Sequence, residues 1–206
     1  YKRQEHNERS VPEKTIAHLI KELPAFPEHL QLMYLILFCT GIRKSEVCTI
    51  KSGAFYSQGN ENWMRIYQSK MRREKVIPVP SLLVGLVNDY EKKYGIKNGE
   101  YLFKNKKGGV FNGQTFSNQM IRECKVRGIA CGDYIFRAHD YRHNLATSMY
   151  GNGVSIQGVR DYLGHSSENM TKQYIDFMPE RIVSAEDKYF SKNQSFKLKG
   201  AEDDER

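Results

Sequence analysis

The sequence predicts an α+β fold, mainly α-helical with one small antiparallel β-sheet. Apolar residues recur at helical spacing through most of the chain, whereas a single region that begins at Ala54 alternates as strands do. Polar stretches that contain turn residues separate these segments. With 206 residues, of which 39% are hydrophobic, the chain is long enough for one large domain with a buried core.

Two helices begin the chain. The stretch Ser10-Val11-Pro12-Glu13 is a capping box with proline near the first helical position. Apolar residues follow it at helical spacing, at Ile16, Leu19, Ile20 and Leu23. A second helix, over residues 28–39, is apolar nearly all round, which predicts a central place in the core. Thr40-Gly41 ends this helix.

The strands and the remaining helices follow in order. Residues 63–67 alternate and residues 75–79 are rich in β-forming residues, so the polar stretch 69–74 between them predicts a hairpin turn. Helical spacing returns over residues 82–93, 115–127, 139–150 and 156–163, and a further helix runs from about Glu168 towards Tyr174. Residues 179–190 predict one more short helix, and residues 191–206 a disordered end.

The charge of the chain is unevenly distributed. The net charge is +8, but residues 1–150 hold 24 Lys and Arg against 14 Asp and Glu, whereas residues 151–206 hold 8 against 10. A basic body with a slightly acidic tail favours a polyanionic partner, such as DNA or RNA. Charge alone leaves this open, because many basic proteins bind no nucleic acid.

Several classes of protein are excluded. The longest apolar run, residues 32–39, is too short to cross a bilayer, and the polar residues 1–10 are not a signal peptide. The four cysteines form no CxxC pair and have no histidine at zinc-finger spacing. We therefore expect no membrane partner, no metal and no cofactor, and a reducing cytoplasmic compartment.

Several short motifs carry candidate chemistry. On a helix, His139 and Arg142 are three residues apart and share a face. The guanidinium can bind two oxygens of a phosphate, and the imidazole beside it can transfer a proton. A solvated helix face is the alternative interpretation of this pair. Arg43 follows a glycine turn with its head group outward, and Glu46 is placed to pair with it or to brace the next helix.

Three further residues are weak signals when each is taken alone. Lys70 stands at the end of a predicted strand, and Gly164 before His165 allows a tight helix exit. Tyr174 follows His165 by nine residues. A tyrosine is mostly neutral at pH 7, because its pKa is about 10, so it needs cationic neighbours to act as a nucleophile.

Together, in this order, these motifs resemble those of the tyrosine recombinase (phage integrase) family. The matching stretches are TGIRKSEV, QSK before REKVIPVP, HDYRHNLAT, LGHSS and Tyr174, and the resemblance covers about residues 10–190. Asn144 and Tyr141 depart from the usual residues of the family, although neither position is catalytic in it. Lys70 and Lys75 both flank the hairpin turn, and Lys70 matches the family better because it ends the second strand.

The resemblance implies a tyrosine recombinase catalytic domain that cleaves and rejoins DNA through a 3′-phosphotyrosyl link without metal or ATP. It assigns the nucleophile to Tyr174, the phosphate clamp to Arg43, Arg142 and His165, protonation of the leaving oxygen to Lys70, and the base to His139. The expected function is a site-specific recombinase (integrase) of a mobile element. The alternatives are an inactive DNA-binding module of the same fold and a topoisomerase or resolvase of related chemistry.

The expected partners are double-stranded DNA and, on it, further copies of the chain in a homotetramer; a monomer is the alternative for the free fragment. Expected DNA contacts, outside the catalytic set, are Lys44, Arg72, Arg73, Gln119, Arg122 and Lys125. Residues 1–9 are interpreted as a linker from a missing upstream DNA-binding domain, and residues 10–178 as the catalytic domain. Residues 179–206 form a tail that packs on its own domain or on a neighbouring protomer. We expect a cytoplasmic, nucleoid-associated protein.

Overall fold

The computed structural model of the protein describes residues 11–68, 71–129, 134–165, 169 and 171. By its internal contacts the chain divides into residues 1–175 and 176–206, and all the described residues belong to the first unit. Lys70, Tyr174 and the tail over residues 179–206 lie outside the described residues. Of the helix expected towards Tyr174, residues 169 and 171 are described, and both are helical.

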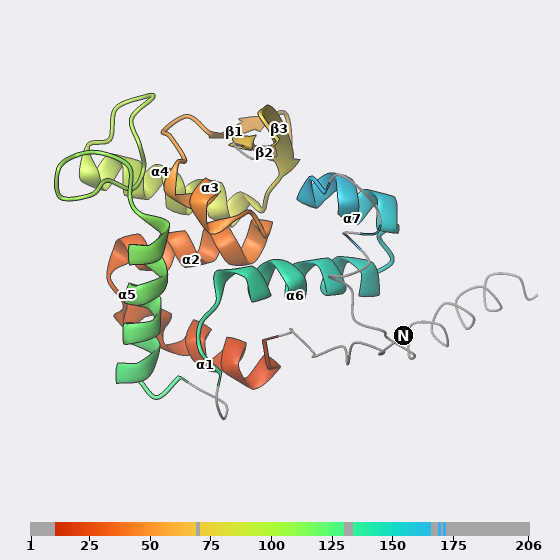
Figure 1. Cartoon of the computed structure of the whole chain (residues 1–206). Helices are drawn as coiled ribbons and strands as arrows, with labels where there is room; N and C mark the ends of the chain where they lie inside the picture. Colours follow the sequence, from red (N-terminus) through yellow and green to blue (C-terminus); the bar gives the residue numbers. More distant parts are fainter. Residues whose placement is uncertain (1–10, 69–70, 130–133, 166–168, 170, 172–206) are drawn as a thin grey trace, which may run out of the picture. The chain divides into compact units, whose positions relative to one another are not determined.

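The predicted fold class is confirmed: the unit is mostly helical with one three-stranded sheet (Figure 1). The elements in chain order are α1 (Glu13–Glu22), the 3₁₀ turn η1 (Leu23–Ala25), α2 (Glu28–Thr40), α3 (Lys44–Cys48), β1 (Phe55–Gln58), β2 (Glu61–Gln68), β3 (Arg73–Pro78), α4 (Ser81–Tyr94), α5 (Gly113–Val126), α6 (Ala138–Gly151) and α7 (Ile156–Leu163).

Helix α2 is the centre of the core, as its apolar sequence predicts. Leu30, Met33, Ile36 and Leu37 on this helix have no exposed surface. The helix contacts α3, α4, α5 and α6, and Figure 1 shows α6 running alongside it. Ile20 on α1, expected on the buried face, is 44% exposed instead. No helix in the described ranges is long and apolar enough to cross a membrane.

The sheet has the order β1-β2-β3, and both pairs are antiparallel. Its inner face is apolar, since Phe55, Met64 and Ile77 are buried and lie opposite one another across the strands. The hairpin turn is shorter than predicted, because β3 begins at Arg73, paired with Gln68, rather than at Lys75. Strand β1 and helix α3 were not predicted, because four and five residues are too few to show a periodicity.

Candidate active site

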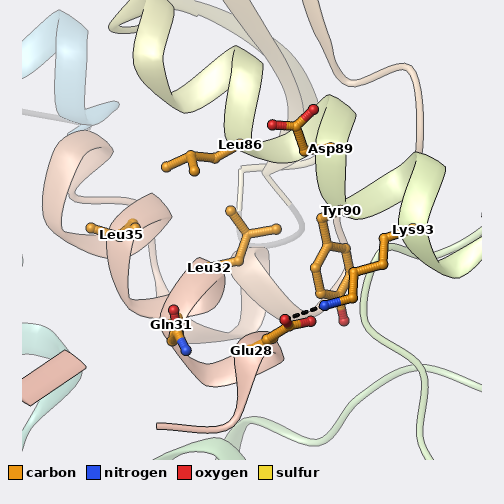
Figure 2. Close-up of a pocket in the computed structure, with 8 residues that line it drawn as sticks. All are labelled: Glu28, Gln31, Leu32, Leu35, Leu86, Asp89, Tyr90 and Lys93. Carbon is orange, nitrogen blue, oxygen red and sulfur yellow. Dashed lines mark hydrogen bonds and ion pairs between the residues drawn. The ribbon is translucent and has the colours of Figure 1, made fainter. Parts of the chain in front are cut away.

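A cleft of about 510 Å³ brings together side chains from the start of α3, from α5 and from the start of α6. Its basic members are Arg43, Lys44, Arg137, His139 and Arg142. A smaller pocket of about 190 Å³ lies between α2 and α4, with Leu32, Leu35 and Leu86 in its lining and Lys93 paired with Glu28 (Figure 2). Because the smaller pocket holds none of the predicted catalytic residues, the larger cleft is the candidate site.

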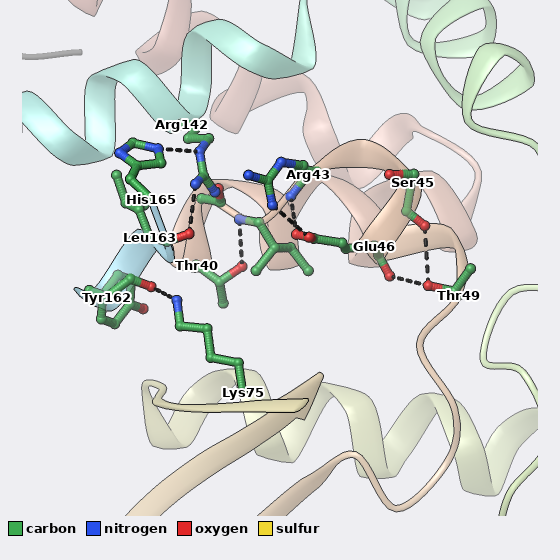
Figure 3. A network of polar contacts seen from close by, with 12 residues as sticks. Thr40, Arg43, Ser45, Glu46, Thr49, Lys75, Arg142, Tyr162, Leu163 and His165 are labelled. Carbon is green, nitrogen blue, oxygen red and sulfur yellow. Dashed lines mark hydrogen bonds and ion pairs between the residues drawn. The ribbon is translucent and has the colours of Figure 1, made fainter. Parts of the chain in front are cut away.

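Arg142 is the most deeply buried charged group of the cleft, with 2% of its surface exposed. Its Nη1 donates to the Gly41 carbonyl at 2.7 Å and its Nη2 to the Leu163 carbonyl at 2.6 Å (Figure 3). These carbonyls stand at the C-terminal ends of α2 and α7, where the helix dipoles are negative and favour a cation. The ends of two helices therefore hold the guanidinium in one orientation.

Two glycines make this arrangement possible, and they are the glycines of the TGIR and LGH motifs. Gly41 has φ +59°, and a Cβ there would lie 2.9 Å from Leu145 Cδ2. Gly164 has φ +70°, and a Cβ there would lie 2.7 Å from the amide of Gln68. Both positions require a left-handed backbone and close approach, which only glycine accepts without strain. The motifs thus place the carbonyls that Arg142 needs.

His165 lies beside Arg142 and is 5% exposed. Its Nε2 lies 3.3 Å from Arg142 Nε, which donates to it (Figure 3). On the other side of the ring, Nδ1 lies 3.0 Å from Thr171 Oγ1. Burial, and after it the positive charges of Arg142, Arg43, Lys75 and His139, lower the pKa of the imidazole to about 3. His165 is therefore neutral near pH 7 in the free chain.

Arg43 is held by Glu46, as one of the two sequence interpretations proposed. The Arg43 backbone N–H donates to Glu46 Oε2 at 2.8 Å, and Arg43 Nη1 pairs with Glu46 Oε1 at 2.9 Å. Glu46 is 2% exposed and the Arg43 side chain 22%, so a buried carboxylate braces a partly exposed guanidinium. Arg43 is also the N-terminal cap of α3, which fixes its backbone.

His139 and Arg142 share the cleft, as their spacing on a helix predicts. The two residues differ in depth, because His139 is exposed whereas Arg142 is buried. Arg137, directly before α6, also lines the cleft, and its Nε pairs with Asp140 at 2.8 Å. The cleft thus has a buried guanidinium at its floor and an exposed imidazole nearer its rim.

Lys75, which the sequence left as the weaker of two lysine candidates, is half-buried beside this site. Its Nζ donates to the Tyr162 carbonyl at the end of α7 (Figure 3). Burial lowers the pKa of the Lys75 ammonium to about 7, and the charge of Arg142 acts in the same direction. The period of two in β3 gave the missed signal, since Lys75 and Ile77 share a strand face and Ile77 is buried.

The predicted DNA contacts fall in different places. Lys44 lines the cleft, with its Nζ 3.5 Å from Ser117 Oγ, and Arg72 and Arg73 are exposed at the start of β3. On α5, however, the cleft-lining residues are Gln114, Ser117 and Ile121. Gln119 contacts His29 at 3.2 Å, Arg122 pairs with Glu123, and Lys125 is exposed; none of the three is among the described residues that line the cleft.

The two positions that depart from the family pattern have structural contacts. The Asn144 amide pairs with the backbone of Val11, accepting from its N–H at 2.8 Å and donating to its carbonyl at 3.3 Å. Tyr141 packs in the core against Tyr34 and Phe136, with ring centroids 5.2 and 5.4 Å away. Both side chains therefore contact other parts of the fold, and neither is among the residues that line the cleft.

The arrangement is suited to an anion with several oxygens. Arg43, His139 and Arg142 line the cleft, with His165 and Lys75 beside Arg142, and fixed donors such as the two guanidiniums stabilise negative charge without reorganisation. In the part of the chain that the structure describes, no three His, Cys, Asp or Glu side chains are grouped so as to hold a metal ion.

Comparison with known proteins identifies the family. The model of the phage integrase family matches residues 9–181, so the chain belongs to this family. It is 30% identical over 190 residues to transposase B from transposon Tn554 of Staphylococcus aureus, which covers 89% of this chain and 30% of the transposase. It is 27% identical to tyrosine recombinase XerC of Rickettsia bellii, over 74% of this chain and 48% of that protein.

Solved structures share the fold. The crystal structure of XerA recombinase matches with a TM-score of 0.73 at 21% identity, over 92% of this chain and 66% of that one. The Tn1549 transposon integrase, in complex with transposon right end DNA, matches with a TM-score of 0.67 at 16% identity, over 88% and 65% of the two chains. This chain thus spans about a third of the transposase relative and about half of the Rickettsia relative.

Proposed function

We propose that this chain is the catalytic domain of a site-specific DNA recombinase of a mobile element, which cleaves and rejoins strands through a 3′-phosphotyrosyl intermediate. One observation carries the proposal: Arg142 is buried and held by the carbonyls of Gly41 and Leu163, and Arg43, His139 and His165 lie around it. The similarity to transposase B and to XerC supports a role in recombination.

The chemistry follows from these residue types. The Tyr174 oxygen attacks the phosphorus, the bond from phosphorus to the 5′-oxygen breaks, and the tyrosine is left esterified to the 3′-phosphate. His139 accepts the tyrosine proton, and Lys70 protonates the departing 5′-oxygen. Arg43 and Arg142 bind the equatorial oxygens of the transition state. A 5′-hydroxyl from a second strand then reverses each step, and one phosphodiester replaces another, so no ATP is consumed.

The partner in this proposal is double-stranded DNA, with four copies of the chain on it during exchange. The basic cleft, with Lys44 at its edge and Gln114 and Ser117 opposite, supports contact with the DNA backbone and grooves. We further propose that residues 1–9 link this domain to an upstream DNA-binding domain and that residues 179–206 contact a neighbouring protomer. The proposed location is the nucleoid.

The decisive experiment replaces Tyr174 with phenylalanine in the full chain. Wild-type protein is expected to form a covalent adduct with a nicked suicide duplex, and Tyr174→Phe to bind the same duplex without forming it. Tyr67→Phe is the matched control, because Tyr67 is 55% exposed on the outer side of the sheet, and it should cleave like the wild type.

Each alternative has its own result. An adduct that persists in Tyr174→Phe identifies another nucleophile and overturns the proposal. Sequence-specific binding by the wild type with no adduct at all identifies an inactive DNA-binding module. A strand-transfer assay with two labelled duplexes separates the remaining alternatives, because plasmid relaxation without exchange of labels is the behaviour of a topoisomerase.

A further inference from the structure

We infer that Arg137 binds a phosphate of the DNA other than the scissile phosphate that Tyr174 attacks, and that Asp140 is the positioning residue that orients its guanidinium. This role deepens the proposed function and rests on it, because it takes double-stranded DNA as the partner of the cleft. No motif in the sequence included Arg137, which stands two residues before His139 and directly before α6.

The head group of Arg137 is exposed at the cleft. Arg137 is one of the residues that line the cleft, and its side chain is 66% exposed. Its Nε donates to Asp140 Oδ2 at 2.8 Å. Among the described residues, its two Nη nitrogens have no hydrogen-bond partner. Because a guanidinium carries five N–H donors, those on the Nη nitrogens can bind a ligand.

Asp140 holds this head group in place. The Asp140 side chain is 7% exposed, and its backbone N–H donates to the Arg137 carbonyl at 3.0 Å. A buried carboxylate needs a partner, because desolvation disfavours its charge. With Nε bound to this carboxylate, the guanidinium has fewer orientations than an unpaired surface arginine. It therefore loses less conformational entropy when it binds a ligand.

The charges around Arg137 favour a phosphate as this ligand. The lining of the cleft, in the described part of the chain, includes no Asp or Glu. Asp140 is not among the lining residues, and its charge is neutralised by Arg137. A planar guanidinium can bind two oxygens of one phosphate. An exposed arginine in a cleft of one sign of charge is therefore suited to the DNA backbone.

A neighbouring side chain is suited to the same ligand. Ile135, two residues before Arg137, also lines the cleft and is 60% exposed. Arg137 has extended backbone angles, and in extended backbone residues two apart lie on one side. An exposed isoleucine beside an arginine fits a nucleotide, because the sugar and the thymine methyl group offer apolar surface next to the phosphates.

The depth of the arginines separates two phosphates. Arg142, assigned to the scissile phosphate, is 2% exposed at the floor of the cleft, whereas the side chain of Arg137 is 66% exposed. Contacts to other phosphates fix the register of a DNA strand without touching the reacting atoms. Arg137 is thus a DNA-binding residue, and Asp140 acts on DNA through it.

The first test measures binding of the full chain to the suicide duplex by fluorescence anisotropy over a range of salt concentrations. In Arg137→Ala, the slope of log affinity against log salt should become shallower by about 1, the value for one phosphate contact. The affinity at low salt should fall by roughly tenfold or more, as for a lost hydrogen bond to a charged group.

Arg122→Ala is the matched control for this test. Arg122 is 67% exposed, pairs with Glu123 and is not among the residues that line the cleft, so its replacement should leave the slope unchanged. A wild-type slope in Arg137→Ala would overturn the inference, as would equal changes in the two variants.

A change in the DNA locates the contact. Phosphates of the suicide duplex are replaced one at a time by uncharged methylphosphonates, and the adduct marks the scissile position. The wild type should lose affinity at a phosphate outside that position, and Arg137→Ala should show no loss there. A wild type that is weakened at the scissile phosphate alone contradicts the inference, even if Arg137→Ala fails to fold.

The role of Asp140 is tested by a double-mutant cycle. Asp140→Ala should weaken binding of the duplex in the wild-type background but not in Arg137→Ala, because Asp140 acts through Arg137. Asp140→Asn keeps an oxygen that can accept from Nε, so it should restore part of the affinity. Equal losses in both backgrounds are the result expected of a merely structural residue and would remove Asp140 from this role.

Failure of this inference and failure of the proposed function give different results. Salt dependence is measured on binding, so it does not require cleavage. An Arg137-dependent slope without any adduct rejects the proposed reaction and keeps the phosphate contact. A normal adduct with a wild-type slope in Arg137→Ala rejects the phosphate contact alone.

Discussion

The two walls of the cleft differ in burial. On the α6 side, Arg142 lines the cleft and is 2% exposed, and His165, which it contacts, is 5% exposed; their contacts include carbonyls and hydroxyls of the fold itself. On the α5 side, Gln114 is exposed, and Lys44 reaches only Ser117, at 3.5 Å. Hydrogen bonds within the fold hold the Arg142 guanidinium in one orientation, and such preorganised donors suit transition-state stabilisation. The exposed wall keeps its side chains solvated, which suits adjustable contacts with DNA.

The largest loss of cleavage rate and of stability is expected when Arg142, on the buried wall, is replaced. Arg142→Ala is expected to slow cleavage by about 10²–10³ or more, the loss typical of one preorganised donor. It should also lower the free energy of unfolding by about 1–3 kcal/mol for each carbonyl, of Gly41 and Leu163, that loses its donor. Single-turnover cleavage and urea unfolding measure the two effects.

Two further variants of arginine sharpen this prediction. Arg142→Lys keeps a charge but lacks the planar fork, so it should recover little of the cleavage rate. Arg122→Ala, on the exposed side of α5 with its side chain 67% exposed, should change the unfolding free energy by less than about 0.5 kcal/mol. Wild-type cleavage by Arg142→Lys would show that the buried wall needs only charge.

An intermediate effect on stability and on cleavage is expected at Lys75, whose hydrogen bond to the Tyr162 carbonyl joins β3 to the end of α7. Its folded pKa is about 7, below the ordinary value of 10.5, so above pH 7 the unfolded chain binds more protons than the folded one and stability rises with pH. The urea midpoint of the wild type should therefore increase from pH 7.5 to 8.5, above the range in which His165 of the unfolded chain titrates. Lys75→Met should remove this increase.

The Lys75 variant also has a kinetic readout. Loss of the contact with the Tyr162 carbonyl should slow cleavage by roughly tenfold, because the end of α7 also carries the Leu163 carbonyl that holds Arg142. Lys92→Met, an exposed change on α4, is the matched control and should alter neither the rate nor the pH dependence. A midpoint that still rises with pH in Lys75→Met would remove Lys75 as the source.

The smallest effect is the loss of DNA affinity that we expect from substitutions on the exposed wall. Gln114→Ala should weaken DNA binding by about 1 kcal/mol, the lower end of the range for one lost side-chain contact to a base. Gln119→Ala should leave it unchanged, because Gln119 contacts His29 and does not line the cleft. Fluorescence anisotropy at fixed salt measures both, and equal losses would show that α5 approaches DNA with a different face.

The sequence placed individual elements well where local rules act. Helix α7 was predicted with its bounds, because the apolar spacing over residues 156–163 is clear and Gly164 stops the helix in the left-handed region. The prediction that His139 and Arg142 share one site also follows from local geometry, since residues three apart lie on one helix face. Such inferences need no knowledge of the partners of a segment.

Tertiary contacts decided what the sequence left open. The cleft-lining residues of α5 could not be chosen, because periodicity defines the faces of a helix without saying which face borders a cleft. Lys75 was the weaker of two lysine candidates in the sequence, and only its contact with the Tyr162 carbonyl, 87 residues away in the chain, places it beside the site. Burial by distant segments also lowers the pKa of His165 from its ordinary 6.5 to about 3.

The sequence by itself determined the family, the fold class and the order of the basic residues, because these are recorded in residue types and in their spacing along the chain. Only the tertiary structure decided which donor meets which acceptor. The Gly41 and Leu163 carbonyls come from segments 101 and 21 residues away from Arg142, and they hold its guanidinium through the negative ends of two helices. Every residue has a backbone carbonyl, so a motif in the sequence does not show which carbonyl accepts a hydrogen bond from Arg142.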